Sequence, residues 1–97
     1  MKQHKVIVQA EAQEEVDAIR TYQNTIDPKR GQRFIDAFQA CLEQLKANPS
    51  FQQRKGNYRH LMLHKLPYRV AFEVEEGTVY VYQVRHTSQK PSRKFGP

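Results

Sequence analysis

The alternation of apolar and polar positions predicts a β-hairpin over Leu66–His86. The first half of this stretch has an apolar residue at every second position, at Val70, Phe72 and Val74. This period of two is typical of a strand with one buried face. Gly77 suits the tight turn that follows, because glycine accepts a positive φ. The return run, residues 78–84, is almost entirely β-branched or tyrosine, which indicates a central strand covered on both sides.

Two amphipathic helices are predicted ahead of the hairpin. The first has apolar residues at three- and four-residue steps, at Ala12, Val16, Ile19, Tyr22 and Ile26. The second has a stronger stripe, at Phe34, Ile35, Phe38, Cys41, Leu42 and Leu45. Asp27-Pro28 ends the first helix, because a proline disfavours the helical region for the residue before it, and starts the second, with Asp27 as its N-cap. Asn48-Pro49 ends the second, and so short a connection implies an antiparallel helical hairpin.

Two shorter strands complete the predicted fold, one over Lys5–Gln9 and one over Tyr58–His64. The order is then strand, two helices and three antiparallel strands. Helices separated from strands along the chain indicate an α+β fold, β-α-α-β-β-β, with the helical hairpin packed on one face of a small antiparallel sheet. The other face is expected to be open to solvent. Residues 1–90 are expected to form one domain, and residues 91–97 a flexible basic tail.

Charge is distributed unevenly along the chain. The net charge is +6, and residues 51–97 carry all of it, with nine Lys or Arg against three acids. A basic half that contains several aromatics suits an anionic partner, either a nucleic acid or an acidic protein segment, although a solubilising surface would look the same. One cysteine, Cys41, cannot form an internal disulfide, which is compatible with a reducing cytoplasm. No run is apolar enough to span a membrane, and no spacing of histidine, cysteine and acidic residues indicates a metal site.

The hairpin gathers polar groups at one end. Arg69 lies near the start of its first strand, and Arg85-His86 closes the second, so antiparallel pairing brings these ends together. Arg69 lies on the side of its strand opposite Val70, and is therefore expected on the open face of the sheet. Without further information, this cluster is also what a solvated basic face looks like, and His86 would then simply bond a loop.

The whole plan resembles the RelE/ParE superfamily of type II toxin–antitoxin toxins, the plasmid-stabilisation proteins, over roughly residues 5–90. The resemblance rests on the order and spacing of several short pieces: the first helix with Ala12, Leu42…Leu45…Asn48-Pro49, Arg59 with Leu61, Tyr68-Arg69-Val70 leading into Phe72 and Val74, and Val84-Arg85-His86. It implies a cytoplasmic toxin without a cofactor, neutralised by an antitoxin whose flexible segment wraps around it.

The RelE-like branch implies a metal-free endoribonuclease that cleaves mRNA in the ribosome. Arg69 and His86 would be the catalytic residues. His86 would transfer a proton as the 2′-hydroxyl attacks the phosphate, and Arg69 would hold the phosphate. Lys55, Arg59 and Arg85 would add positive charge toward RNA, the target or the antitoxin. No carboxylate follows the second helix to act as base, and Thr87 stands where this branch often has an aromatic.

The ParE-like branch implies inhibition of DNA gyrase without catalysis, and this chain is closer to it in its long helical hairpin and its leucine-rich stretch ending in Asn48-Pro49. Arg69 and His86 would then be structural or antitoxin contacts. We therefore predict a ParE-like toxin, with a RelE-like mRNA interferase as the alternative. An inactive relative or a nucleic-acid-binding module remains a further alternative.

Overall fold

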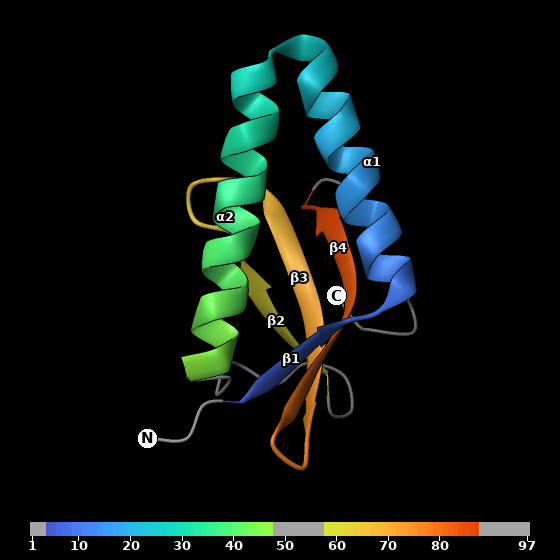
Figure 1. Cartoon of the computed structure of the whole chain (residues 1–97), viewed down its shortest axis with the longest axis vertical. Helices are drawn as coiled ribbons and strands as arrows, with labels where there is room; N and C mark the ends of the chain where they lie inside the picture. Colours follow the sequence, from blue (N-terminus) through green and yellow to red (C-terminus); the bar gives the residue numbers. More distant parts are fainter. Residues whose placement is uncertain (1–3, 48–57, 88–97) are drawn as a thin grey trace.

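The fold has the predicted order of elements. The computed structural model describes residues 4–47 and 58–87 of the 97-residue chain. The elements in chain order are β1 (Lys5–Val8), α1 (Ala10–Ile26), α2 (Pro28–Ala47), β2 (Tyr58–Met62), β3 (Tyr68–Glu75) and β4 (Thr78–His86) (Figure 1). The α+β class is confirmed. Lys55 and the predicted tail of residues 91–97 lie outside the described residues.

The four strands form one mixed sheet in the order β1-β4-β3-β2. The β2–β3 and β3–β4 pairs are antiparallel, but β1 runs parallel to β4, so the sheet is not wholly antiparallel as predicted. The cause lies in the helical hairpin, which returns the chain to its starting end. There the His4 N–H donates to the Lys46 carbonyl at 2.8 Å. β2 and β4 therefore run in the direction of β1, and β3 runs against them.

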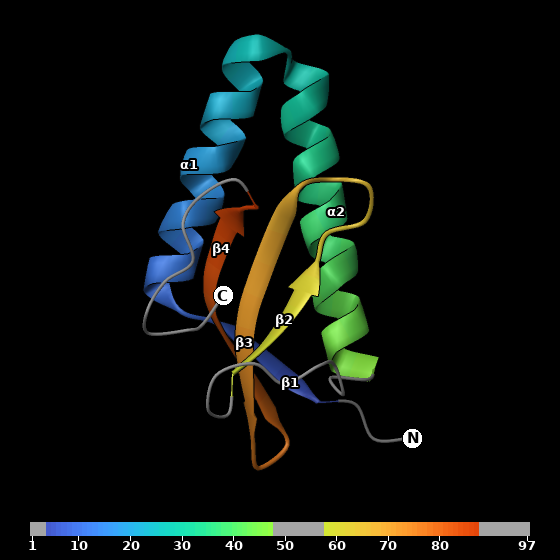
Figure 2. The same ribbon diagram turned by 180° about the vertical axis from the view of Figure 1, so that it is seen from behind.

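Both helices cover one face of the sheet, and no described helix lies on the other (Figures 1 and 2). Asp27 caps α2 as predicted, since its carboxylate accepts the Lys29 N–H at 2.9 Å. The core lies between the helices and the central strands. Its largest fully buried side chains are Phe34, Leu45, Val70, Phe72, Val79, Val81 and Val84. The predicted stripe of α2 is confirmed, with Phe38 and Cys41 buried and Leu42 packed at the edge of the core.

The predicted stripe of α1 is only partly correct. Ala12 and Val16 are buried, but Tyr22 is 61% exposed and Ile26 49% exposed. The helical hairpin extends beyond the end of the sheet, so its tip has no layer to pack against (Figure 1). Gln23, which the apolar pattern passed over, is buried instead.

The β3–β4 hairpin has a tight turn and a bulge. Glu76 and Gly77 both have positive φ, 48° and 79°, as a two-residue type I′ turn requires. Further along, Phe72 pairs with Val81 but Ala71 pairs with Gln83, so β4 holds one extra residue, Tyr82. Such a bulge reverses which side chains face the helices from that point onward.

Candidate functional site

The register places the two residues of the predicted catalytic pair on opposite faces of the sheet. Tyr68 pairs with His86, and Arg69 pairs with Arg85. Directly opposed residues of an antiparallel pair share a face. Tyr68 packs against Phe34 of α2, with ring centroids 5.1 Å apart, so Tyr68 and His86 face the helices. Arg69 and Arg85 face the other way. Antiparallel pairing does bring the two strand ends together, as predicted, but Arg69 and His86 do not face the same space.

The bulge at Tyr82 decides this arrangement. Val79 and Val81 face the helices before the bulge, and Val84 and His86 face them after it. Without the extra residue, His86 would have shared the open face with Arg69. The sequence carried a signal of this shift, because the apolar positions of the return run change from odd numbers to even.

Arg85 is tied to α1 by Glu15. One Glu15 carboxylate oxygen, Oε1, accepts the Val84 N–H at 2.9 Å, and the other, Oε2, lies 3.6 Å from Arg85 Nε. Glu15 thus occupies the edge of β4 beyond the point where β1 ends. Burial raises the pKa of the Glu15 carboxyl, while the Val84 N–H and the Arg85 charge lower it and Glu11 raises it, with a net increase. Arg85 is therefore partly neutralised and is a poor candidate for binding a phosphate.

Arg59 lies apart from Arg69 and Arg85. It pairs with Phe72, whose side chain faces the helices and is fully buried, so Arg59 stands on the helix-side face at the outer strand β2. Lys55 lies outside the described residues. Of the predicted binding residues that the structure describes, only Arg69 and Arg85 therefore lie together.

Aromatic side chains form a cluster on the open face, toward the turn of the hairpin. The Tyr82 hydroxyl donates to Glu73 Oε1 at 3.2 Å, and its ring meets that of Tyr58 edge to face at 5.6 Å. Tyr80 stacks beside Tyr82 at 6.5 Å. Burial, and then Glu73, raises the pKa of Tyr82. Because these rings pack against one another and Tyr82 bonds Glu73, their contacts support a role in packing the sheet rather than in stacking on nucleic-acid bases.

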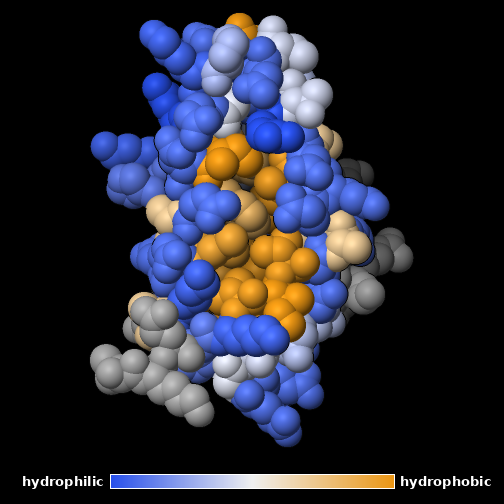
Figure 3. All heavy atoms as spheres, in the orientation of Figure 1, coloured by the Kyte–Doolittle hydropathy of each residue, from blue (hydrophilic) through white to orange (hydrophobic). Residues whose placement is uncertain are grey.

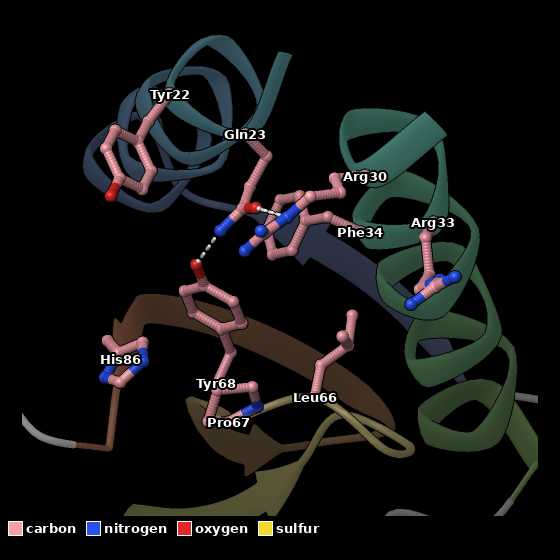
Figure 4. A pocket seen from close by; sticks show the side chains of 9 residues that line it. All are labelled: Tyr22, Gln23, Arg30, Arg33, Phe34, Leu66, Pro67, Tyr68 and His86. Atoms are coloured by element: carbon pink, nitrogen blue, oxygen red, sulfur yellow. Dashed lines mark hydrogen bonds between the residues drawn. The ribbon is translucent and has the colours of Figure 1, made fainter. Parts of the chain in front are cut away.

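A pocket of about 400 Å³ lies where the helical hairpin meets the other end of β3 and β4, away from the turn (Figure 4). Its lining comes from both helices, the β2–β3 connection and the ends of β3 and β4, namely Tyr22, Gln23, Arg30, Arg33, Phe34, Leu66, Pro67, Tyr68 and His86. Among these lining residues, His86 alone was predicted from the sequence to be a functional residue. Two features of the sequence could have indicated this pocket. Gln23 lies one helical turn beyond Ile19 in α1, and Arg30 and Arg33 lie three residues apart in α2.

A chain of hydrogen bonds crosses this pocket. Arg30 Nε donates to Gln23 Oε1 at 2.9 Å, and Gln23 Nε2 donates to the Tyr68 hydroxyl at 2.8 Å. Figure 4 shows these three side chains in line from α2 through α1 to β3. The His86 ring lies edge-on to Tyr68, with centroids 5.3 Å apart. The chain satisfies the amide of buried Gln23 and ties the helical hairpin to the sheet.

Residues 4–47 and 58–87 contain no group of three histidine, cysteine or acidic side chains placed to hold a metal ion. None of their helices is long and apolar enough to cross a membrane.

Comparison with known proteins gives a family and similar solved structures. The sequence model of the family described as the ParE toxin of the type II toxin–antitoxin system, parDE, matches residues 6–91. No curated protein sequence matches the chain. A solved structure described as the chromosomal ParDE toxin–antitoxin system from P. aeruginosa is similar, with a TM-score of 0.74 and 16% sequence identity. The match covers 88% of this chain and 97% of that one, so the fold is shared over nearly its whole length.

Proposed function

Because this chain belongs to the ParE toxin family of type II toxin–antitoxin systems, we propose that it arrests growth by inhibiting DNA gyrase in the cytoplasm. Gyrase inhibition and neutralisation by a cognate antitoxin are typical of this family. The observation that carries the proposal is the family match over residues 6–91, which spans all the helices and strands but the first residue of β1.

The geometry of the sheet supports inhibition by binding rather than RNA cleavage. Cleavage by 2′-hydroxyl attack needs a proton-transfer group and a cation at the same phosphate. Arg69 and His86 face opposite sides of the sheet, and Arg85 is held by Glu15. Arg69 and His86 are therefore proposed as structural residues or as contacts to the antitoxin, and not as a catalytic pair.

The antitoxin is proposed to cover the helix side of the toxin. Figure 3 shows apolar atoms exposed between α1 and α2. The partly buried apolar side chains that these helices and β1 contribute around the core include Val6, Val8, Ile19, Ile35 and Leu42. An apolar area rimmed by polar residues is typical of a protein interface. The net charge of +6 would favour an antitoxin whose binding segment carries acids.

The direct test is supercoiling by purified gyrase in the presence of the purified chain. We expect inhibition, and we expect an equimolar amount of antitoxin to remove it. Arg69→Ala and His86→Ala should inhibit gyrase as wild type does, provided that each variant retains the wild-type melting temperature. Normal supercoiling at toxin concentrations well above those of gyrase would refute gyrase as the target.

A second experiment separates the gyrase and ribosome targets in cells. Wild type and both variants are induced without antitoxin, and mRNA ends and plasmid supercoiling are measured in the same cultures. Gyrase inhibition predicts altered supercoiling, intact mRNA and growth arrest by all three proteins. Cleaved mRNA with normal supercoiling, and loss of toxicity in both variants, would establish the mRNA interferase instead.

A further inference from the structure

We propose that the pocket between the helical hairpin and the end of the β3–β4 sheet binds a phosphate monoester carried on a planar ring. The proposal goes beyond gyrase inhibition and does not depend on it. It rests on three features of the pocket: its charge, an unused hydroxyl donor and its apolar walls.

The pocket is lined by cationic and neutral side chains and by no acidic ones. Arg30 and Arg33 line it from one face of α2, and no aspartate or glutamate lines it. Among residues 4–47 and 58–87, neither arginine forms an ion pair, and the Arg33 guanidinium makes no hydrogen bond. Figure 4 shows Arg33 entering from the side opposite Tyr22 and His86. Two guanidinium groups without a carboxylate make this a site for an anion.

Tyr68 supplies a third donor from a different direction. Its hydroxyl oxygen accepts from Gln23 Nε2, because Gln23 Oε1 is already the acceptor for Arg30. The hydrogen of the hydroxyl group therefore remains to be donated. Tyr68 is 5% exposed, and no acceptor for this hydrogen is found in the described part of the chain. A buried donor that has no acceptor and lines a pocket indicates that a ligand supplies one.

The number and directions of the donors favour phosphate over carboxylate. Arg30 uses Nε for Gln23, so only its terminal nitrogens reach a ligand. Figure 4 shows the Arg30 guanidinium beside Gln23, the Arg33 guanidinium on the α2 side and the Tyr68 ring rising from the sheet, so these donors come from different directions. The three terminal oxygens of a phosphate monoester, spread as a tetrahedron, can accept from three sides, whereas a planar carboxylate offers two oxygens.

The remaining walls of the pocket fit a ring. Phe34, Leu66, Pro67 and the Tyr22 ring provide apolar surface beside the cationic groups. A volume of about 400 Å³ falls in the range that holds a small organic ligand and exceeds what one phosphate needs. A planar ring attached to the phosphate would lie against these walls, as aromatic surfaces favour.

The experiment titrates the isotopically labelled full chain and follows backbone amide shifts by NMR. The probes are adenosine 5′-monophosphate, phenyl phosphate, inorganic phosphate and adenosine. We expect at least one ring-bearing phosphate to bind roughly tenfold more tightly than both inorganic phosphate and adenosine, with shifts at the pocket residues. A preference for adenosine 5′-monophosphate identifies a nucleotide site, and equal binding of phenyl phosphate shows that one ring suffices. Equal affinity for inorganic phosphate or for adenosine would overturn the proposal.

Two variants with matched controls test the residues. Arg33→Gln should weaken binding of the ring-bearing phosphates roughly tenfold, whereas Arg20→Gln, which removes the same charge from an exposed position outside the pocket, should change it less than about twofold. Tyr22→Ala should weaken these ligands but not inorganic phosphate, and Ile26→Ala, an exposed position on the same helix, should change neither. Equal losses in Arg33→Gln and Arg20→Gln would show general charge attraction and overturn the site.

Discussion

Gln23 lies on the same face of α1 as Ala12 and Val16, and its side chain is buried as theirs are. A polar side chain is accommodated at this position because it forms two hydrogen bonds. It accepts from Arg30 and donates to Tyr68. A buried amide is tolerated only when its hydrogen-bonding groups are satisfied. One residue thus joins both helices to the sheet and shapes the pocket beside it.

Tyr68→Phe should destabilise the protein by about 1–3 kcal/mol, because it leaves the buried Gln23 amide without an acceptor. Urea unfolding followed by circular dichroism measures this loss. Tyr80→Phe is the control. Its hydroxyl makes no hydrogen bond to another described residue, so it should shift stability by less than about 0.5 kcal/mol. Equal stability of the Tyr68→Phe variant and wild type would show that the Gln23–Tyr68 bond contributes nothing net.

Glu15 should make stability depend on pH. Its pKa in the folded protein is raised above the ordinary value of 4.5, chiefly by burial. Above pH 4.5 the unfolded chain releases the Glu15 proton while the folded protein still holds it. The stability that Glu15 contributes is therefore full below pH 4.5, and it is lost as pH rises through the raised pKa. Glu15→Gln should therefore gain stability relative to wild type as pH increases through this range.

The measurement is the free energy of unfolding of both proteins across that pH range, with Glu14→Gln as the control. Glu14 neighbours Glu15 in the chain but is exposed. A difference between Glu15→Gln and wild type that stays constant with pH would contradict the raised pKa.

Cys41 should be chemically silent in the folded protein. It is 3% exposed, and burial raises the pKa of its thiol to about 12, so the reactive thiolate does not form near neutral pH. Ellman's reagent at about pH 8 should react only after urea is added. Cys41 is the only cysteine, so the whole signal reports this site. Fast reaction without urea would mean that α2 opens readily.

At the scale of elements, α2 contributes most of the helix-side core. Phe34 and Phe38 lie along one stripe, with ring centroids 6.4 Å apart, and both are buried. The same helix presents Arg30 and Arg33 near its start, so it provides core packing along its length and pocket charge at one end.

Phe38→Ala should cost about 3–5 kcal/mol of stability, because a large buried ring is removed and the site cannot fully collapse. Thermal and urea unfolding provide the measurement. Ile26→Ala offers a comparison at an apolar residue on the exposed tip of the helical hairpin, where the cost should be small. If Phe38→Ala lost less than about 1 kcal/mol, the α2 stripe would not be a structural core.

At the scale of the whole molecule, the two faces of the sheet have different environments. The helix side holds the core, the pocket and an apolar surface between α1 and α2 (Figure 3). The open side holds the tyrosine cluster together with Arg69 and Arg85. The net charge of +6 belongs to the molecule as a whole and acts at longer range than any single contact.

Antitoxin binding should weaken as salt increases, because a chain with a net charge of +6 would attract an acidic partner. Titration calorimetry at about 0.05 M and about 0.5 M salt should show a clear rise in Kd, since the Debye length falls severalfold over this range. An unchanged Kd would show that the charge serves solubility and that apolar contacts alone hold the antitoxin.

Much of this fold could be predicted because its elements are specified by local signals. The boundary between the two helices followed from Asp27-Pro28, and the β3–β4 hairpin followed from the alternation and Gly77, whereas Asn48-Pro49 lies outside the described residues. These signals act over a few residues, so they can be recognised before the chain is folded. The exposure of Tyr22 and Ile26 could not be recognised in this way, because it depends on how far the sheet extends beneath the helices.

The sequence alone determined the α+β class, the order of elements, the proximity of the two hairpin ends and the resemblance to a toxin family that the comparison confirms. Only the tertiary structure decided which side chains share a space. One extra residue at Tyr82 turns His86 to the helices and away from Arg69, and Gln23 and Tyr68 meet across 45 residues of sequence. The physical reason is that a face of a sheet is set by pairing register, which depends on both strands, whereas an element's type is set by its own residues.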